Sequence, residues 1–91
     1  MEVLKKLLNK RGVYNTFQVL SLFDDFRAGK YAFYKKLNEF SYYNSFLRIK
    51  NILIKNELLN IDNHNIMCYY ELTSKGKEMF VLLQKLDKLL K

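Results

Sequence analysis

The spacing of hydrophobic residues along the chain predicts five helices and one β-hairpin. Apolar residues recur every three or four positions, the period of an amphipathic helix, in residues 2–10, 15–26, 31–39, 42–56 and 74–91. After residue 56 the period falls to two, and the inward row of this alternation is Ile66, Cys68, Tyr70 and Leu72. This row predicts a half-buried strand, paired with a short strand at 58–61 across a polar turn at 62–65. Another turn is expected at residues 28–30, between the second and third helices. The pattern indicates one domain with a mainly α fold and a small β-hairpin, which places it in the α+β class.

Short polar side chains and glycine mark the expected helix ends. The candidate N-caps are Asn15 or Thr16 for the second helix, Ser41 for the fourth, and Thr73 or Ser74 for the last. Arg11-Gly12 is expected to end the first helix. Asp24 and Asp25 then fall near the C-terminal end of the second helix, where the helix dipole disfavours anions. A contact with Arg27 or Lys30 would offset that cost.

The helix predicted at residues 42–56 has two contrasting sides. The inward row consists of Tyr42, Phe46, Ile49 and Leu53, and the opposite row, which we call the polar ridge, consists of Asn44, Arg48, Asn51 and Lys55. Leu47, Ile52 and Ile54 are expected to widen the apolar side, so that most of the circumference is buried. A narrow ridge without carboxylates suits the major groove of B-DNA, which admits a helix and displays hydrogen-bond donors and acceptors. The alternative is a core helix whose exposed side happens to be polar.

The last predicted helix carries more apolar side chains than one core can cover. Its stripe consists of Met79, Leu82, Leu83, Leu86, Leu89 and Leu90, while Phe80 and Val81 lie off that stripe. A second apolar side would be exposed in a monomer, and exposed apolar patches usually mark a contact surface. We therefore expect a homodimer built on residues 73–91, with Leu4 and Leu7 of the N-terminal helix at 1–12 contributing.

The charge of the chain points to a polyanionic partner. The net charge is +7 over 91 residues, which favours nucleic acid first and an acidic membrane surface second; the alternative is that the lysines only confer solubility. The positive surplus falls in residues 1–12, 41–58 and 74–91. By contrast, the charged residues of segment 59–73 are Asp62 and Glu71, both acidic. The positive charge therefore does not lie on the predicted hairpin.

Reactive side chains are too few for a catalytic or metal site. Cys68 is the one cysteine and His64 the one histidine, and two ligands do not make a structural zinc site. The sequence has no glycine-rich phosphate loop and no nucleophile–base arrangement. We expect no enzyme activity, no metal and no cofactor, and no small-molecule effector is identifiable. Without a signal peptide or membrane span in the sequence, we expect a cytoplasmic protein that does not bind membranes.

Two stretches of sequence carry a resemblance to a known family. SYYNSFLRIKNILIKNELL, residues 41–59, resembles the recognition helix of winged-helix DNA-binding domains and its exit into the wing. YYELTSKGKEMF, residues 69–80, is similar to the second wing strand and the start of the last helix, and Tyr34–Leu37 to the second helix. The match covers residues 14–91 and is closest to small dimeric winged-helix regulators of crenarchaeal viruses and to multiple-antibiotic-resistance and PadR-type repressors. It implies a winged helix-turn-helix at 14–72, followed by a dimerisation helix.

The resemblance implies a homodimeric regulator of transcription that binds double-stranded DNA, in the host cytoplasm if the protein is viral. The expected DNA contacts are Tyr43, Asn44, Ser45, Arg48, Asn51 and Lys55 of the recognition helix, Lys35 and Lys36 of the preceding helix, and Asn63 and His64 of the wing. Two departures are Glu57, where the family usually has glycine, and a wing tip, residues 62–65, without arginine or lysine. A non-specific architectural DNA-binding protein and a winged-helix module for protein assembly are the alternatives.

Overall fold

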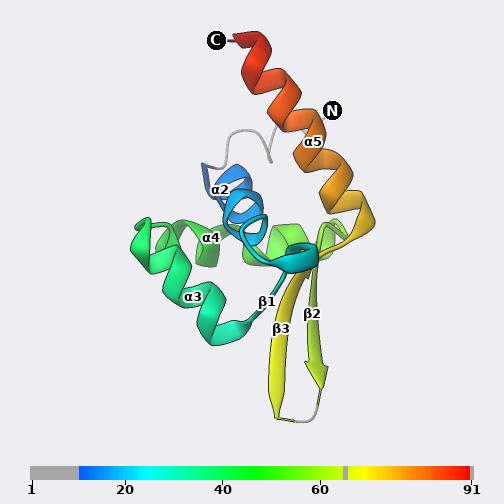
Figure 1. Cartoon of the computed structure of the whole chain (residues 1–91). Helices are drawn as coiled ribbons and strands as arrows, with labels where there is room; N and C mark the ends of the chain where they lie inside the picture. Colours follow the sequence, from blue (N-terminus) through cyan, green and yellow to red (C-terminus); the bar gives the residue numbers. More distant parts are fainter. Residues whose placement is uncertain (1–10, 65, 91) are drawn as a thin grey trace.

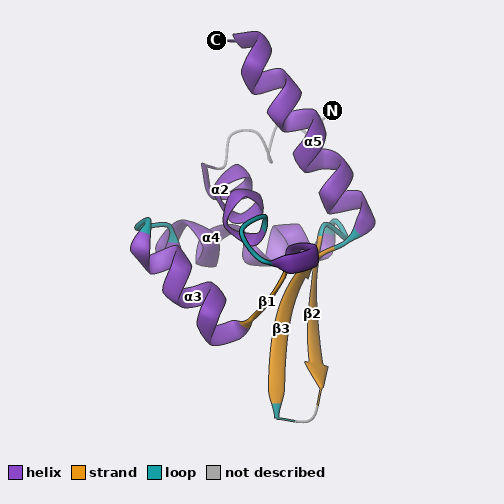
Figure 2. Ribbon diagram, viewed as in Figure 1, coloured by secondary structure: helices purple, strands orange, loops and turns teal. Residues whose placement is uncertain are grey.

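The fold is mainly helical with one small antiparallel sheet (Figures 1 and 2). The computed structural model describes residues 11–64 and 66–90, with the backbone alone at Arg11 and His64. The elements are α2 (Arg11–Leu20), the 3-10 turn η1 (Asp24–Phe26), β1 (Arg27–Gly29), α3 (Lys30–Glu39), α4 (Tyr43–Lys55), β2 (Leu59–His64), β3 (Met67–Leu72) and α5 (Ser74–Leu90). The helix predicted at residues 2–10 lies outside the described residues.

The sheet has three strands in the order β1-β3-β2, all antiparallel to their neighbours. Arg27 pairs with Glu71 at one edge, and Leu59 pairs with Leu72 on the other side of β3. Figure 1 shows the β2–β3 hairpin extending from one end of the molecule, while the C-terminal half of α5 extends from the opposite end. The helices α2, α3 and α4 lie between these two projections.

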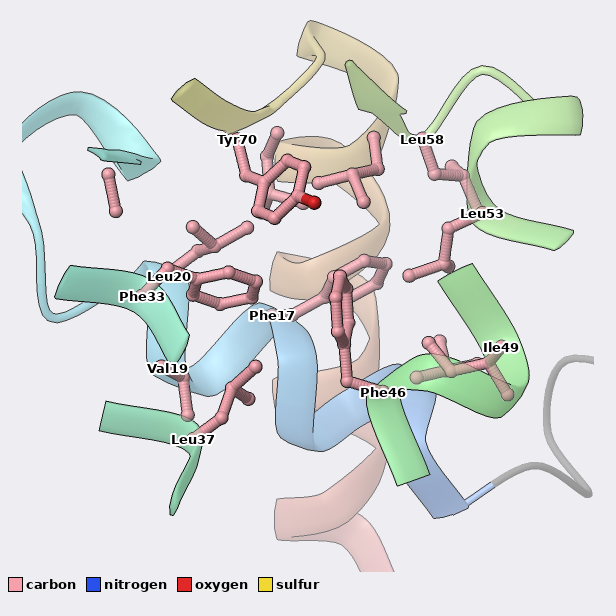
Figure 3. Packing of buried hydrophobic residues seen from close by; sticks show 14 of the residues in the cluster. Phe17, Val19, Leu20, Phe33, Leu37, Phe46, Ile49, Leu53, Leu58 and Tyr70 are labelled. Carbon is pink, nitrogen blue, oxygen red and sulfur yellow. The ribbon is translucent and has the colours of Figure 1, made fainter. Parts of the chain in front are cut away.

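Aromatic and leucine side chains from every helix meet in one core (Figure 3). Phe17 of α2, Phe33 of α3 and Phe46 of α4 are fully buried. The Phe33 ring meets the Phe46 ring edge-on, with centroids 5.0 Å apart, and meets Tyr70 of β3 at 5.4 Å. Edge-to-face packing of this kind is the arrangement that aromatic rings prefer. The core therefore fixes α4 against α3 and against the sheet.

The second helix differs from the sequence prediction at both ends. It spans Arg11–Leu20, not 15–26, so Thr16 is a fully buried residue within the helix and not a cap. Gly12 lies inside α2 and does not end a helix. A Cβ at this position would lie 2.6 Å from the carbonyl oxygen of Ser45. The prediction that Gly12 ends a helix was therefore wrong, because glycine is needed here for the close approach of α2 to α4.

The early end of α2 removes the predicted conflict with the helix dipole. Asp24 and Asp25 follow the helix in η1, and Asp25 has a positive φ of 56°. The Asp25 carboxylate accepts a hydrogen bond from Lys77 Nζ at 3.0 Å, so its partner is in α5 and is neither Arg27 nor Lys30. This pair is largely exposed, and exposed ion pairs stabilise a fold only weakly.

The sheet is larger than the predicted hairpin. Residues 27–29 form β1, although a turn was expected at 28–30, because pairing with β3 supplies the hydrogen bonds that the short segment needs. The strand β2 continues to His64, so most of the expected turn at 62–65 belongs to the strand. Ile66, expected in the inward row, is instead 97% exposed at the hairpin tip.

Candidate nucleic-acid interface

Helix α4 is buried on one side and exposed on the other. Phe46, Ile49 and Leu53 are buried, and the residues that face solvent include the whole polar ridge, Asn44, Arg48, Asn51 and Lys55. The predicted split between an inward row and the ridge is therefore confirmed for the described structure. Burial of the opposite side holds the ridge in place without using any ridge side chain for packing.

Two apolar residues lie beside the ridge and were predicted to be buried. Leu47 is 45% exposed and Ile54 is 37% exposed, whereas Ile52 is half-buried. The expectation that most of the circumference of α4 is buried was therefore wrong, because neighbouring elements cover only the side that carries Phe46 and Leu53. We use the term outer face of α4 for the exposed set Asn44, Leu47, Arg48, Asn51, Ile54 and Lys55.

Tyr43 and Ser45, both expected to contact DNA, lie at the margins of this face. Tyr43 is half-buried, and its ring meets Tyr34 of α3 edge-on with centroids 5.0 Å apart. Ser45 is half-buried on the side where α4 approaches α2. Tyr42, expected in the inward row, is half-buried and stacks on Phe40 at 5.6 Å.

The helices α3 and α4 end in the same hydrogen-bond pattern. After α3, Tyr42 N–H donates to Leu37 O at 2.8 Å, and after α4, Leu58 N–H donates to Leu53 O at 2.9 Å. This is the Schellman motif, which requires a left-handed residue just beyond the helix. That residue is Ser41, with a φ of 62°, after α3, and Glu57, with a φ of 60°, after α4.

These left-handed residues correct one prediction and explain a second. Ser41 terminates α3 and does not cap α4, whose N-cap residue Tyr42 makes no side-chain cap bond. Glu57 occupies the position where the resemblance led us to expect glycine, and its backbone adopts the conformation that favours glycine. Asn56 also contributes, since its side-chain amide donates to Ile52 O at 2.8 Å.

The carboxyl end of α4 is joined directly to the amino end of α5. Thr73 Oγ1 donates to Glu57 O at 2.6 Å, and Thr73 N–H donates to Leu58 O at 3.1 Å. Thr73 Oγ1 also accepts from Gly76 N–H at 3.0 Å, which confirms Thr73 as the N-cap of α5. A Cβ at Gly76 would overlap the Leu58 carbonyl oxygen. The junction thus depends on one hydroxyl and one missing side chain.

The predicted contacts of α3 are less clearly available. Lys35 is exposed. Lys36 is half-buried, and its Nζ pairs with Glu39 at 3.1 Å, one helical turn away. Surface pairs at this spacing are weak, so this contact leaves Lys36 able to exchange Glu39 for a phosphate.

The sheet contains an ion-pair network that sequence analysis missed. Arg27 Nη1 donates to Glu71 at 2.7 Å and Nη2 donates to Asp62 at 2.8 Å, so that Arg27 links all three strands. Its guanidinium also lies 4.4 Å from the ring centroid of Tyr69. The hydrogen bonds to Asp62 and then to Glu71 raise the pKa of Arg27. The two acids that gave residues 59–73 their negative charge are thus paired with a cation from outside that segment.

The hairpin tip is apolar as well as polar. Asn63 is exposed, Ile66 is 97% exposed and Met67 is 50% exposed. The side chain of His64 lies outside the described structure, so its predicted contact with DNA stays a prediction. The ion pair between Arg27 and Asp62 could not be predicted from the sequence, because no periodic pattern of apolar residues marks β1 as a strand.

A pair of tyrosine hydroxyls lies behind α4. Tyr34 Oη and Tyr70 Oη are 2.7 Å apart, and the Tyr70 residue is only 2% exposed. Burial and then the hydrogen bond with Tyr34 raise the pKa of Tyr70 above its usual value near 10. The pair is a structural link between α3 and β3.

Helix α5 is buried only over its first half. Phe80 is 4% exposed and is surrounded by the rings of Tyr14, Phe17 and Phe26. Of the predicted dimer residues, Met79 and Leu83 are half-buried against the core, whereas the exposed ones are Leu82 at 60%, Leu86 at 43%, Leu89 at 82% and Leu90 at 79%. Leu4 and Leu7 lie outside the described residues. Phe80, which sequence analysis placed off the stripe, is the residue that anchors α5.

The part of the chain that the structure describes holds no metal cluster and no membrane-spanning helix, but it has a cavity of about 310 Å³ between α2 and α5, lined in part by Leu22, Phe40 and Gln84. Within residues 11–64 and 66–90, no group of three or more His, Cys, Asp or Glu side chains could hold a metal ion. No helix in the same ranges is long and apolar enough to cross a membrane. No protein-family model, curated protein or solved structure matches the chain.

Proposed function

We propose that this protein is a winged-helix regulator of transcription that binds double-stranded DNA as a homodimer, with the outer face of α4 in the major groove. One observation carries the proposal: the polar ridge is exposed along its length while the other side of α4 is fixed in the core. No acidic residue lies between Tyr43 and Lys55. A rigid, cationic helix side without carboxylates is what a major groove lined by phosphates accommodates.

The arrangement around α4 supports this proposal. A short turn joins α3 to α4. The order of the helices, β1 and the hairpin is compatible with a winged helix-turn-helix. The Arg27 network supports a wing beside the DNA backbone, because it pairs both Asp62 and Glu71 with a cation. One guanidinium offsets one of the two carboxylates, so the network repels phosphates less than two unpaired carboxylates would.

The exposed leucines of α5 support the dimer. Leu83, Leu86 and Leu90 line a groove of about 180 Å³ together with Tyr14 and Asp87. A second copy of α5 would bury this groove and the leucines beyond it. A two-fold dimer would present two recognition helices to major grooves about 34 Å apart, on a nearly palindromic site.

The decisive experiment measures duplex binding of Arg48→Ala over a series of salt concentrations. We expect a loss of about 1–3 kcal/mol per recognised site if Arg48 contacts guanine, or a salt slope smaller by about one if it contacts phosphate. Lys85→Ala is the matched control, because it removes one exposed charge from α5. If both variants bind like the wild type, Arg48 has no role in DNA binding.

Sedimentation of the wild type and of Leu86→Asp tests the dimer separately. We expect a dimer at micromolar concentration and a monomer after the substitution, since an aspartate would be buried unpaired in the interface. A monomeric wild type, or a variant that still forms dimers, would contradict a dimer built on α5.

An architectural DNA-binding protein is the second candidate, and the hairpin tip favours it. Ile66 and Met67 are exposed apolar side chains at the end of a projecting hairpin, and such side chains serve as wedges in minor-groove proteins that bend DNA. Competition by random duplex separates the two candidates: a ratio of affinities near one favours the architectural protein. A chain that self-associates but binds no duplex at low salt would instead be a module for protein assembly.

A further inference from the structure

One row of the outer face of α4 alternates amide and aliphatic side chains. Asn44, Leu47, Asn51 and Ile54 follow one another at intervals of three, four and three residues, which places them along one side of the helix. All four are exposed. Packing of the opposite side of α4 thus leaves the aliphatic side chains of Leu47 and Ile54 exposed next to the two asparagine amides.

This row does not have the form of a protein-docking patch. Leu47 and Ile54 are seven residues apart, or about 10.5 Å along the helix, and Asn51 lies between them. Apolar patches that bind proteins are contiguous. A polar surface with single aliphatic contacts placed at intervals instead matches the edge of base pairs in the major groove, where one base presents a methyl group among hydrogen-bonding atoms.

The chemistry of each side chain selects the same two bases. An asparagine amide donates to N7 and accepts from N6 of adenine, and an aliphatic side chain contacts the 5-methyl group of thymine. The outer face has no aspartate or glutamate to accept from the amino group of cytosine. Arg48 and Lys55 are the outer-face residues suited to guanine, and both lie outside this row.

We propose that this row of the outer face of α4 recognises A·T base pairs, with Asn44 and Asn51 on adenine and Leu47 and Ile54 on thymine methyl groups. The row spans about 15 Å, which corresponds to about four base pairs at a rise of 3.4 Å. This inference rests on the proposed function. It adds to the proposed function a class of target and four specificity-determining residues, which packing leaves exposed.

Deoxyuridine tests the proposal, because it differs from thymidine only by lacking the 5-methyl group. The probe is the duplex that the protein selects from a random pool, made once with thymine and once with deoxyuridine at every thymine. We expect A·T pairs in the selected site, and about fourfold weaker binding of the deoxyuridine duplex for each methyl group contacted. A selected site without A·T pairs would overturn the proposal.

The variant Leu47→Ala/Ile54→Ala shows whether the protein detects the methyl groups. Both residues are exposed and alanine favours helix, so the variant should fold. Its affinities for the two duplexes should differ less than those of the wild type, whereas Leu22→Ala, which removes a leucine 58% exposed outside α4, should keep the full difference. Since deoxyuridine also changes the duplex itself, an equal difference in wild type and double variant would overturn the proposal.

The failure of this proposal is distinguishable from the failure of the proposed function. If the wild type binds both duplexes equally while Arg48→Ala still weakens binding, α4 contacts DNA but not through thymine methyl groups. If the wild type selects no duplex at all, DNA binding itself is refuted, and this inference with it.

Discussion

Replacing Glu57 by glycine should stabilise the protein, although it removes a side chain. Glu57 is exposed and has a φ of 60° at the end of α4. Its backbone amide donates to Ile54 O at 3.0 Å, and the next amide, that of Leu58, donates to Leu53 O. These two bonds hold Glu57 in the left-handed region, where its Cβ is crowded by the backbone.

The expected gain is the difference between two backbone effects. The left-handed conformation costs an L-residue about 1–2 kcal/mol, and glycine avoids that cost. Glycine also gains freedom in the unfolded chain, which opposes folding by about 0.5–1 kcal/mol. The net stabilisation of Glu57→Gly is therefore about 0.5–1 kcal/mol, with a few tenths added by removing an anion from the negative end of the helix dipole.

Urea unfolding followed by circular dichroism measures this gain. In a domain of this size, a stabilisation of 1 kcal/mol raises the melting temperature by about 4–8 °C. Glu57→Ala is the control, because it removes the charge and keeps the Cβ. The alanine variant should gain only the part due to charge, and glycine should exceed it by several tenths of a kcal/mol. Equal stabilities of the two variants would refute a left-handed cap at the end of α4.

Gly76→Ala should destabilise the fold by about 1–3 kcal/mol in urea unfolding, because the new Cβ overlaps the carbonyl of Leu58; an unchanged midpoint would mean that the junction of α4 and α5 is loose. Arg27→Met should weaken duplex binding most at low salt and speed proteolysis of the hairpin, since two carboxylates lose their partner; binding and cleavage like those of the wild type would contradict this role. The wild type should lose stability as pH rises above about 10, because the unfolded Tyr70 ionises there while the folded phenol, with its raised pKa, stays protonated. Tyr70→Phe should lack that part of the alkaline loss in chemical unfolding across pH 8–12, and an identical pH slope would show that Tyr70 ionises as freely when folded.

The exposed side of α4 was predictable because burial and periodicity agree there. Arg48 and Asn51 repeat at helical spacing opposite Phe46 and Leu53, and no element in the described part of the chain covers them. The same rule failed for Leu47, since apolar residues are not all buried and a protein surface is largely apolar in area. Hydrophobicity alone could not separate the apolar residues that pack from those left outside.

Other features depend on partners distant in sequence. The strand β1 has three residues and no alternation, and only its pairing with β3 makes it a strand. The end of α2 was hidden because Leu22, Phe23 and Phe26 continue the apolar spacing beyond Leu20. The ends of α3 and α4 were predicted to within one residue, but their left-handed caps were not, because Ser41 and Glu57 hold positions where sequence rules look for glycine.

The hydroxyl of Thr73 and the bare backbone of Gly76 have a mechanical consequence. They fasten the last turn of α4 to the first turn of α5 through the carbonyls of Glu57 and Leu58. A rotation of α5 should therefore move the end of α4 with it. In a dimer held together through α5, the junction of α4 and α5 would set the distance and angle between the two copies of α4. If the proposed dimer binds DNA, a substitution at this junction would alter which spacing of half-sites the dimer tolerates, although the substituted residue touches no base.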